Sequence, residues 1–173
     1  GLVAWGIFSR GTGIEQIFLQ GALSDAEPSS ARVAPLEKTS TVGEQCTVKA
    51  GSIYDGDTLR VFCKGEELKI RLCGIDAPEI AQAGGIESRN YLRSRLPDNS
   101  TIGVNRIEKD RYGRTVAEIF LGESFINAEM VREGHAWHYE RYSGNCPNRS
   151  AIAQASQGVQ LTGMPPWEFR KGN

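Results

Sequence analysis

Short stretches with the character of β-strands dominate the chain from residue 46 onward. They are rich in β-branched and aromatic residues, and two of them alternate between apolar and polar positions, as half-buried strands do. Asp55-Gly56 and Lys64-Gly65 are typical turn pairs, and they divide the first three stretches into a meander. The pattern predicts five strands, at Cys46–Tyr54, Thr58–Cys63, Leu68–Leu72, Thr101–Ile107 and Thr115–Phe120.

Helical spacing of apolar residues follows the third and the fifth strand. Ile86–Leu96 ends before Pro97, and Phe125–Glu133 ends before Gly134, which are both usual stop signals. A weaker helix is predicted around Arg149–Gln157. Five short strands with helices inserted in this order predict a mainly β protein of the α+β class. The expected fold is a five-stranded Greek-key barrel of OB type with two to three flanking helices.

Residues 1–43 differ in character from the rest of the chain. Thr12-Gly13-Ile14-Glu15 has the pattern of a capping box, which predicts a short helix near 13–20. The stretch 24–40 is rich in Ser, Ala, Pro and charge, and it is interpreted as a linker. We therefore expect an N-terminal extension over 1–43 and a barrel domain over 44–173. The apolar start is interpreted as a remnant of a targeting or anchoring segment, so the extension is expected to dock to a membrane or another surface.

Composition narrows the possible chemistry. The chain carries 20 basic and 21 acidic residues, a net charge of −1, which argues against holding nucleic acid by bulk charge alone. It has two histidines, too few for a three-histidine metal site. No run of 18 apolar residues is present, so no intact membrane span is expected in this sequence.

The four cysteines form no C-x-x-C pair, which argues against a zinc ribbon or a thioredoxin-like site. Two readings remain open from the residues alone. Two disulfides would indicate an oxidising compartment, whereas four buried thiols would suit the cytosol. The first reading predicts an extracytoplasmic protein that is secreted, periplasmic or tethered to a membrane.

Three polar segments carry the candidate chemistry. They are Asp55-Gly56-Asp57-Thr58, the stretch Arg71–Glu79, and Asp110-Arg111-Tyr112-Gly113-Arg114. Taken singly, each is explained by turn chemistry, a surface ion pair or a solvated hairpin tip. Together they supply hard oxygen ligands for Ca²⁺, two guanidinium groups for a phosphate diester and a carboxylate for a water molecule. Phosphodiester hydrolysis needs that combination, and it requires no histidine.

The same segments resemble the staphylococcal nuclease (thermonuclease) family. Ile53–Thr58 is similar to its first metal-binding turn, and Ile70–Glu79 to its central motif. Asp110–Arg114 is similar to the loop of its second catalytic arginine, and Asn127–Gly134 to the helix after its barrel. The resemblance extends from about Thr47 to Tyr142, a little over half of the chain. It implies an OB-type barrel and Ca²⁺-dependent cleavage of DNA and RNA.

The resemblance also implies a role for individual residues. The expected Ca²⁺ ligands are Asp57, Asp76 and the backbone carbonyl of Ala77, with Asp55 near the metal through a water molecule. Ala77 stands where the best-known member has Thr, and a backbone ligand tolerates that change. The expected catalytic residues are Arg71, Glu79 and Arg114, and the residues expected to bind substrate are Tyr112, Tyr139 and Tyr142.

Three further expectations follow from the implied barrel. The cysteines are expected to pair as Cys46–Cys63 and Cys73–Cys146. The protein is expected to be a monomer with DNA or RNA as its substrate. The rival hypothesis is a non-catalytic OB-fold module that binds nucleic acid or protein, and retention of the whole catalytic set favours the nuclease.

Overall fold

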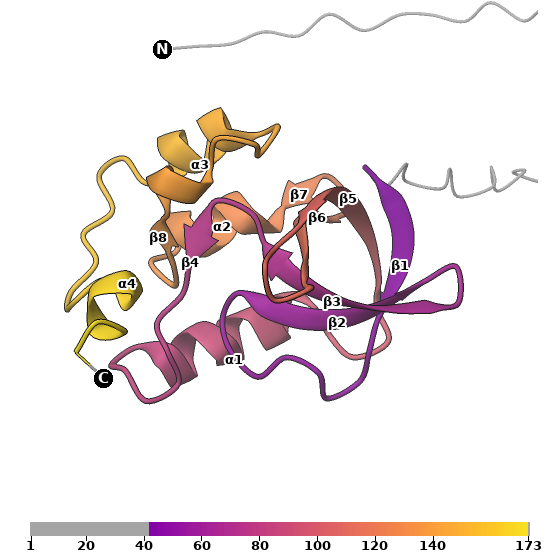
Figure 1. Ribbon diagram of the computed structural model, residues 1–173, viewed down its shortest axis with the longest axis horizontal. Coiled ribbons are helices and arrows are strands. Elements are labelled where there is room, and N and C mark those ends of the chain that lie inside the picture. The colour runs from indigo at the N-terminus through magenta and orange to yellow at the C-terminus, as the bar shows by residue number, and fades with distance from the viewer. Residues whose placement is uncertain (1–41, 173) are drawn as a thin grey trace, which may run out of the picture. The chain divides into compact units, whose positions relative to one another are not determined.

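The computed structural model describes residues 42–172, and five strands of this part close into a barrel (Figure 1). Four neighbouring pairs are antiparallel, and a parallel pairing of β3 with β6 closes the ring. The predicted mixed α+β barrel is therefore confirmed. Its strands are β1 (Glu44–Val48), β2 (Thr58–Cys63), β3 (Glu66–Leu72), β5 (Thr101–Lys109) and β6 (Thr115–Leu121).

Buried and more exposed side chains alternate along β2, so that one face of the strand packs into the barrel interior. Leu59, Val61 and Cys63 of β2 point inward, and none of them is exposed to solvent. The turn Lys64-Gly65 connects β2 to β3, and both residues have positive φ, as a two-residue turn of type I′ requires. The turn predicted at this position is therefore confirmed.

The first predicted strand was too long at its C-terminal end. β1 ends at Val48, and residues 49–57 form a loop instead of continuing to Tyr54. The loop is held by other contacts: Gly51 N–H donates to Asp98 Oδ1 at 2.9 Å, and the side-chain Oγ of Ser52 donates to the Arg60 carbonyl of β2 at 3.1 Å. Asp55-Gly56 consequently lies at the end of a long loop and is not the tip of a tight hairpin.

Helices cover the barrel where the apolar patterns predicted them. Leu92 of the first helix, Leu96 directly after it, Met130 of the second helix and Ile152 of the third are almost completely buried. Figure 1 shows α2 beside α3, which contact one another. The helices are α1 (Gly85–Arg95), α2 (Ile126–Arg132) and α3 (Arg149–Ala155), with a fourth, α4 (Pro166–Phe169), that was not predicted.

Short elements complete the fold and were not predicted either. They are β4 (Ile75–Asp76), β7 (Ser124–Phe125), β8 (Trp137–His138) and a 3₁₀ turn (Glu140–Tyr142). β4 pairs with β8 in a separate two-stranded sheet.

No helix within the described range is long and apolar enough to cross a membrane. The predicted helix near 13–20 and almost all of the predicted extension over 1–43 lie outside the described residues.

One buried side chain fastens the seam between β3 and β6. Asn127 of α2 is fully buried, and its Oδ1 accepts a hydrogen bond from Ile119 N–H at 2.9 Å. Its Nδ2 donates to the carbonyls of Cys73 and Ala117 at 3.0 and 3.2 Å. Because Cys73 follows β3 directly and the other two partners lie on β6, Asn127 links both strands of the seam to α2.

Two disulfides join the cysteine pairs that were expected, Cys46–Cys63 and Cys73–Cys146. The first links β1 to β2 across a sequence separation of 17 residues. The second links the end of β3 to the segment before α3 across 73 residues. Since a crosslink restricts the unfolded chain more when it closes a longer loop, the second is expected to contribute more to stability.

We predict that replacing Cys73 and Cys146 by alanine lowers the free energy of unfolding by about 4 kcal/mol, against about 3 kcal/mol for the Cys46–Cys63 pair. Urea unfolding of the two double variants measures both values. Equal destabilisation, or a larger loss for the shorter loop, would contradict this ranking.

Candidate active site

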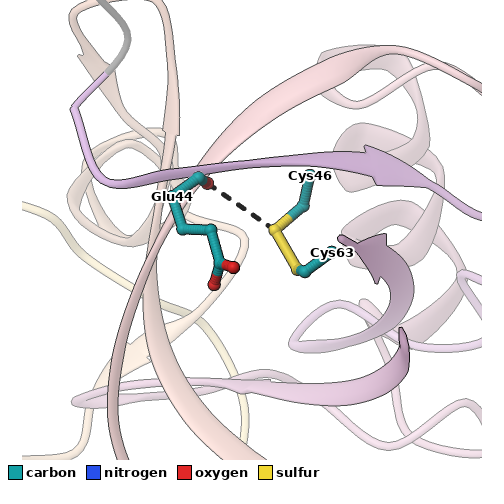
Figure 2. A group of neighbouring side chains, drawn as sticks. All are labelled: Glu44, Cys46 and Cys63. Atoms are coloured by element: carbon teal, nitrogen blue, oxygen red, sulfur yellow. Dashed lines mark hydrogen bonds between the residues drawn. A yellow bond between two sulfur atoms is a disulfide. The ribbon is translucent and has the colours of Figure 1, made fainter. Parts of the chain in front are cut away.

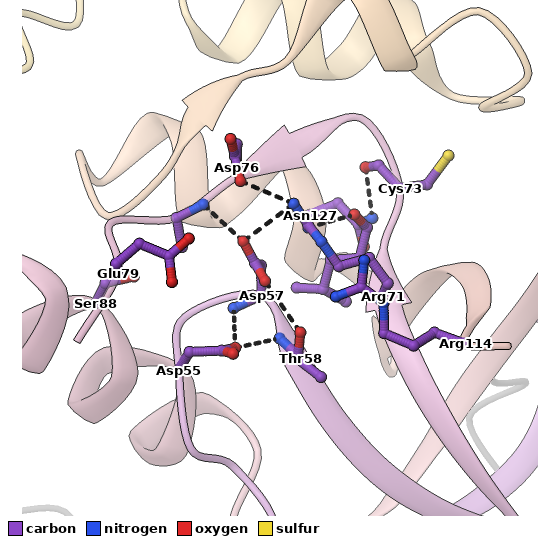
Figure 3. Close-up of polar contacts among 12 residues, drawn as sticks. Asp55, Asp57, Thr58, Arg71, Cys73, Asp76, Glu79, Ser88, Arg114 and Asn127 are labelled. Carbon is purple, nitrogen blue, oxygen red and sulfur yellow. Dashed lines mark hydrogen bonds and ion pairs between the residues drawn. The ribbon is translucent and has the colours of Figure 1, made fainter. Parts of the chain in front are cut away.

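The candidate site lies at one end of the barrel, where three segments meet (Figure 3). Asp57 stands immediately before β2, Asp76 belongs to β4, and Glu79 lies in the loop between β4 and α1. Arg71 is on β3, beside the start of β2, because Thr58 pairs with Arg71 in the sheet register. Residues that are 22 positions apart in sequence, Asp57 and Glu79, are thereby brought to one place.

Two glycines permit this close approach. A Cβ at Gly56 would lie 1.8 Å from Ser88 Oγ and 2.8 Å from the Ala77 Cβ. A Cβ at Gly85 would lie 2.0 Å from the Glu79 carbonyl oxygen. Both positions exclude a side chain, so they fix how the loops carrying Asp57 and Glu79 pack against α1.

Asp57 is 7% exposed and is held by both neighbouring segments. Its Oδ2 accepts a hydrogen bond from Ala77 N–H at 2.7 Å and lies 3.2 Å from Arg71 Nη2. Its Oδ1 accepts a hydrogen bond from the Thr58 hydroxyl at 3.1 Å. These contacts fix the carboxylate in one orientation between the two loops.

Asp76 is 1% exposed and is surrounded by two arginines. Its Oδ1 accepts a hydrogen bond from Arg71 Nη2 at 2.9 Å, and its Oδ2 accepts one from Arg170 Nη2 at 2.6 Å. Burial raises the pKa of Asp76, and the two guanidinium groups oppose that effect. Asp57 and Asp76 therefore share one nitrogen of Arg71, which keeps two buried carboxylates close together.

Asp55 lies near the site and also stabilises the turn that precedes β2. Its Oδ1 accepts hydrogen bonds from the N–H groups of Asp57 and Thr58 at 3.1 and 2.7 Å, which forms a tight Asx-type turn. Burial, followed by the charge of Asp57, raises the pKa of Asp55 to about 6. Negative charge is thus crowded at this end of the loop.

Glu79 is the more accessible acid of the site, with 42% of its side chain exposed. Its Oε1 accepts a hydrogen bond from Arg170 Nη1 at 2.7 Å, and its backbone N–H donates to Gln82 Oε1 at 3.2 Å. In Figure 3 its carboxylate is turned toward the side on which Asp57 lies.

The two candidate catalytic arginines occupy neighbouring strands of the seam. Arg71 pairs with Val116 in the parallel register, and Arg114 precedes Thr115, the partner of Ile70. Arg71 is 14% exposed, whereas Arg114 is 25% exposed and its Nε donates to Asp110 Oδ2 at 2.7 Å. In Figure 3 the Arg114 side chain extends toward the side of the site where Arg71 lies.

The three expected aromatic residues are separated into two places. Tyr112 is 67% exposed beside Arg114, whose guanidinium lies 5.3 Å from the ring centroid. Tyr139 and Tyr142 lie together, with 4.7 Å between their ring centroids, and Tyr142 is 60% exposed. Trp167 stacks on the ring of Tyr139, with 4.9 Å between the ring centroids, and so covers one face of that ring.

The donor set at Asp57 and Asp76 fits a hard divalent cation, because it consists of buried carboxylate oxygens crowded by a third carboxyl group. A second group of potential ligands, Glu44, Cys46 and Cys63, does not fit (Figure 2). Both of its sulfurs belong to a disulfide and offer no thiolate. The Cys46 Sγ only lies 3.6 Å from the Glu44 carbonyl oxygen.

Sequence reasoning missed two residues of this region. Arg170, just after α4, contacts both Asp76 and Glu79 although it follows them by about 90 positions. No local motif marks it, because it reaches the site through tertiary packing alone. Asn127 stood inside a segment with family resemblance, and a polar residue on the apolar side of a predicted helix was the signal for its role.

Comparison with known proteins shows the family of the chain. Residues 69–167 match the model of the family described as staphylococcal nuclease homologue. An uncharacterized endonuclease of Haemophilus influenzae is 39% identical over 125 residues, which is 72% of this chain and 67% of that protein. The chain therefore belongs to the family of staphylococcal nuclease homologues.

Two other relatives show the range of the family. The thermonuclease of Staphylococcus intermedius is 32% identical over 143 residues, which is 78% of this chain and 83% of that protein. The probable staphylococcal-like nuclease CAN3 of rice is 34% identical over 122 residues, 64% of this chain. That match covers 32% of the rice protein, so this chain corresponds to about a third of it.

Replacing Asp55 by Asn tests the cost of burying the Asp55 charge beside Asp57. The amide oxygen of D55N still accepts the two turn hydrogen bonds, but the variant carries no charge. Because the folded-state pKa of Asp55 is raised from 3.8 to about 6, the contribution of Asp55 to wild-type stability is expected to fall as the pH rises from about 4 to about 6 in chelator. D55N is expected to be more stable than wild type by about 1 to 3 kcal/mol at pH 7 and equally stable below pH 4.

Urea unfolding across this pH range measures the difference between the two proteins. D98N is a matched control, since Asp98 Oδ1 also accepts a backbone N–H, from Gly51 in an exposed loop. A D55N variant that unfolds with the same pH dependence as wild type would contradict the proposed cost of burying the Asp55 charge beside Asp57.

Proposed function

We propose that this protein is a calcium-dependent endonuclease that hydrolyses the phosphodiester bonds of DNA, RNA or both. Its membership of the family of nuclease homologues makes it a phosphodiester hydrolase. The observation that carries the finer proposal is the meeting of Asp57, Asp76, Arg71 and Glu79 at one end of the barrel. Two buried acids, a partly buried guanidinium and an accessible acid there form a site for an anionic ester.

Asp57 and Asp76 are proposed to hold the cation, with the Ala77 carbonyl as a further oxygen ligand and Asp55 acting through water. When bound, Ca²⁺ would supply positive charge to a phosphate oxygen. The Asp57 carboxylate is already oriented by Ala77 N–H and the Thr58 hydroxyl, so little rearrangement of this ligand is needed. Such preorganisation lowers the entropic cost of binding.

Glu79 is proposed to act on the attacking water. In hydrolysis a bond forms between the water oxygen and phosphorus, and the bond from phosphorus to one ester oxygen breaks. Glu79 accepts the proton that the water loses, and the departing ester oxygen takes up a proton from solvent. Its 42% exposed side chain gives it access to a water molecule that the buried acids lack.

Arg71 and Arg114 are proposed to stabilise the negative charge that develops on the phosphoryl oxygens. Planar guanidinium groups suit this role because they donate two parallel hydrogen bonds to an oxyanion. Tyr112, Tyr139 and Tyr142 are proposed to stack with bases, an interaction that tolerates every base. Substrate capture would then depend on local charge and stacking, which is compatible with a net charge of −1.

The remaining proposals concern context. We propose an extracytoplasmic location, which is supported by two disulfides. We also propose a monomeric nuclease domain over 44–173 preceded by an extension that docks to a membrane or another surface. A non-catalytic binding module is less well supported, because such a module has no need for an accessible Glu79 beside buried acids.

Cleavage of single-stranded DNA and of RNA tests the proposed activity. Wild type is expected to cleave with Ca²⁺ and to be inactive with chelator. E79Q and R114A are each expected to lower kcat by about 10²-fold or more, because they remove a proton acceptor and a donor to the transition state. R114A is a cleaner test than R71A, since Arg71 also neutralises two buried carboxylates.

E87Q is the control, because Glu87 is exposed on α1 and lies outside the proposed machinery. It is expected to retain wild-type activity. Activity of E79Q equal to that of E87Q would remove the proposed mechanism, and a wild-type protein that leaves both substrates intact would favour the binding module.

Calcium binding tests the proposed ligands separately. D57N keeps an acceptor for Ala77 N–H but loses the negative charge, so its affinity for Ca²⁺ is expected to fall by about tenfold or more. Calorimetric titration of wild type, D57N and E87Q measures this change. Equal affinities of wild type and D57N would refute the ligand assignment.

A further inference from the structure

A segment near the C-terminal end of the described residues reaches back across the candidate site. We call residues 164–170, which include α4, the C-terminal strap. Gln82 Nε2, on the loop after Glu79, donates to the Met164 carbonyl at one end of the strap. Trp167 stacks on Tyr139 in its middle, with an interplanar angle of 6°. Arg170 contacts the acids of the site at its other end.

Arg170 takes up both oxygens of Asp76. Its Nη2 lies 2.6 Å from Oδ2, and its Nη1 lies 3.3 Å from Oδ1. The same Nη1 lies 2.7 Å from Glu79 Oε1. One side chain therefore neutralises the buried acid proposed as a cation ligand and the acid proposed to act on water.

A cation and Arg170 cannot use the same oxygens of Asp76 at once. Asp76 is 1% exposed and Arg71 already occupies its Oδ1, so Oδ2 is the oxygen that a cation would have to share with Arg170. A divalent cation at Oδ2 would add two positive charges beside the guanidinium of Arg170 and would repel it. A cation that binds at Asp76 thus competes with Arg170 for Oδ2.

We propose that the C-terminal strap is an autoinhibitory element, in which Arg170 occupies the cation position and Trp167 covers Tyr139, and that Ca²⁺ opens the site by displacing it. This inference rests on the proposed function, because it assigns a competitor to the same cation site. It adds that cation and substrate access are coupled, since one segment blocks both the carboxylates and an aromatic surface proposed for bases.

The construction of the strap suits displacement. Residues 156–165, which precede α4, contain two glycines with positive φ, Gly158 and Gly163, and most of these residues are half-buried or exposed. The Arg170 side chain is 42% exposed, so it can exchange its contacts with Asp76 and Glu79 for water. By contrast, the barrel and α3 are fixed independently of the strap by the disulfide to Cys146 and by buried Ile152.

Calorimetric titration of the full chain with CaCl₂ tests the proposal. If about one molecule in ten has an open strap, R170A is expected to bind Ca²⁺ about tenfold more tightly than wild type. K171A is the matched control, because the neighbouring Lys171 pairs with Glu168 and does not reach the acids of the site. W167A weakens the strap without touching Asp76, and it is expected to tighten binding in the same direction, which keeps the test valid if R170A does not fold without calcium.

Fluorescence supplies a second measurement. Saturating Ca²⁺ is expected to change the emission of Trp167 as it leaves Tyr139, and W167F is expected to lose that change. Equal calcium affinities of wild type, a folded R170A and W167A would refute the autoinhibitory role of the strap, but they would not contradict the proposed cation site. Absence of calcium binding in every variant would remove the cation site itself, and the strap as its competitor would fall with it.

Discussion

The parallel pairing of β3 with β6 closes the barrel, and the candidate site depends on that closure. It sets Arg71 beside Val116 and brings Arg114 next to the same strand, although these arginines are far apart in sequence. Parallel neighbours need a long connection between them, so the seam is the part of the fold with the least local support. Asn127, fully buried, supplies that support through three hydrogen bonds to the two sides of the seam.

Charge at the end of the barrel follows from the same closure. Asp57 and Asp76 are both almost fully buried, and an isolated buried carboxylate is costly unless it is paired. Arg71 meets this requirement for both acids, since one of its nitrogens lies 3.2 Å from Asp57 and 2.9 Å from Asp76. A group proposed to act on phosphate thus also holds the proposed ligands together, so a substitution at Arg71 is expected to lower stability as well as the proposed activity.

Much of this arrangement could be predicted from the sequence, because it depends on local pattern. Alternation located β2 and β3, and turn chemistry located Lys64-Gly65. The end of β1 at Val48 could not be predicted, since the following loop is held in part by Asp98, which is 47 positions from its partner Gly51. The residues of the proposed site were found through three motifs read together. Arg170 was not found, because a single arginine in a C-terminal tail has no pattern and gains its partners only in the folded chain.

Arg170 also bears on how the protein reaches its folded state. In small metal-dependent domains the ion is part of the folding reaction, because unpaired ligands repel one another without it. Here Asp76 receives positive charge from two side chains of the same chain. The polypeptide thus supplies positive charge to this buried acid itself. We therefore expect the chain to complete its fold and its disulfides without the proposed cation, which would bind only afterwards.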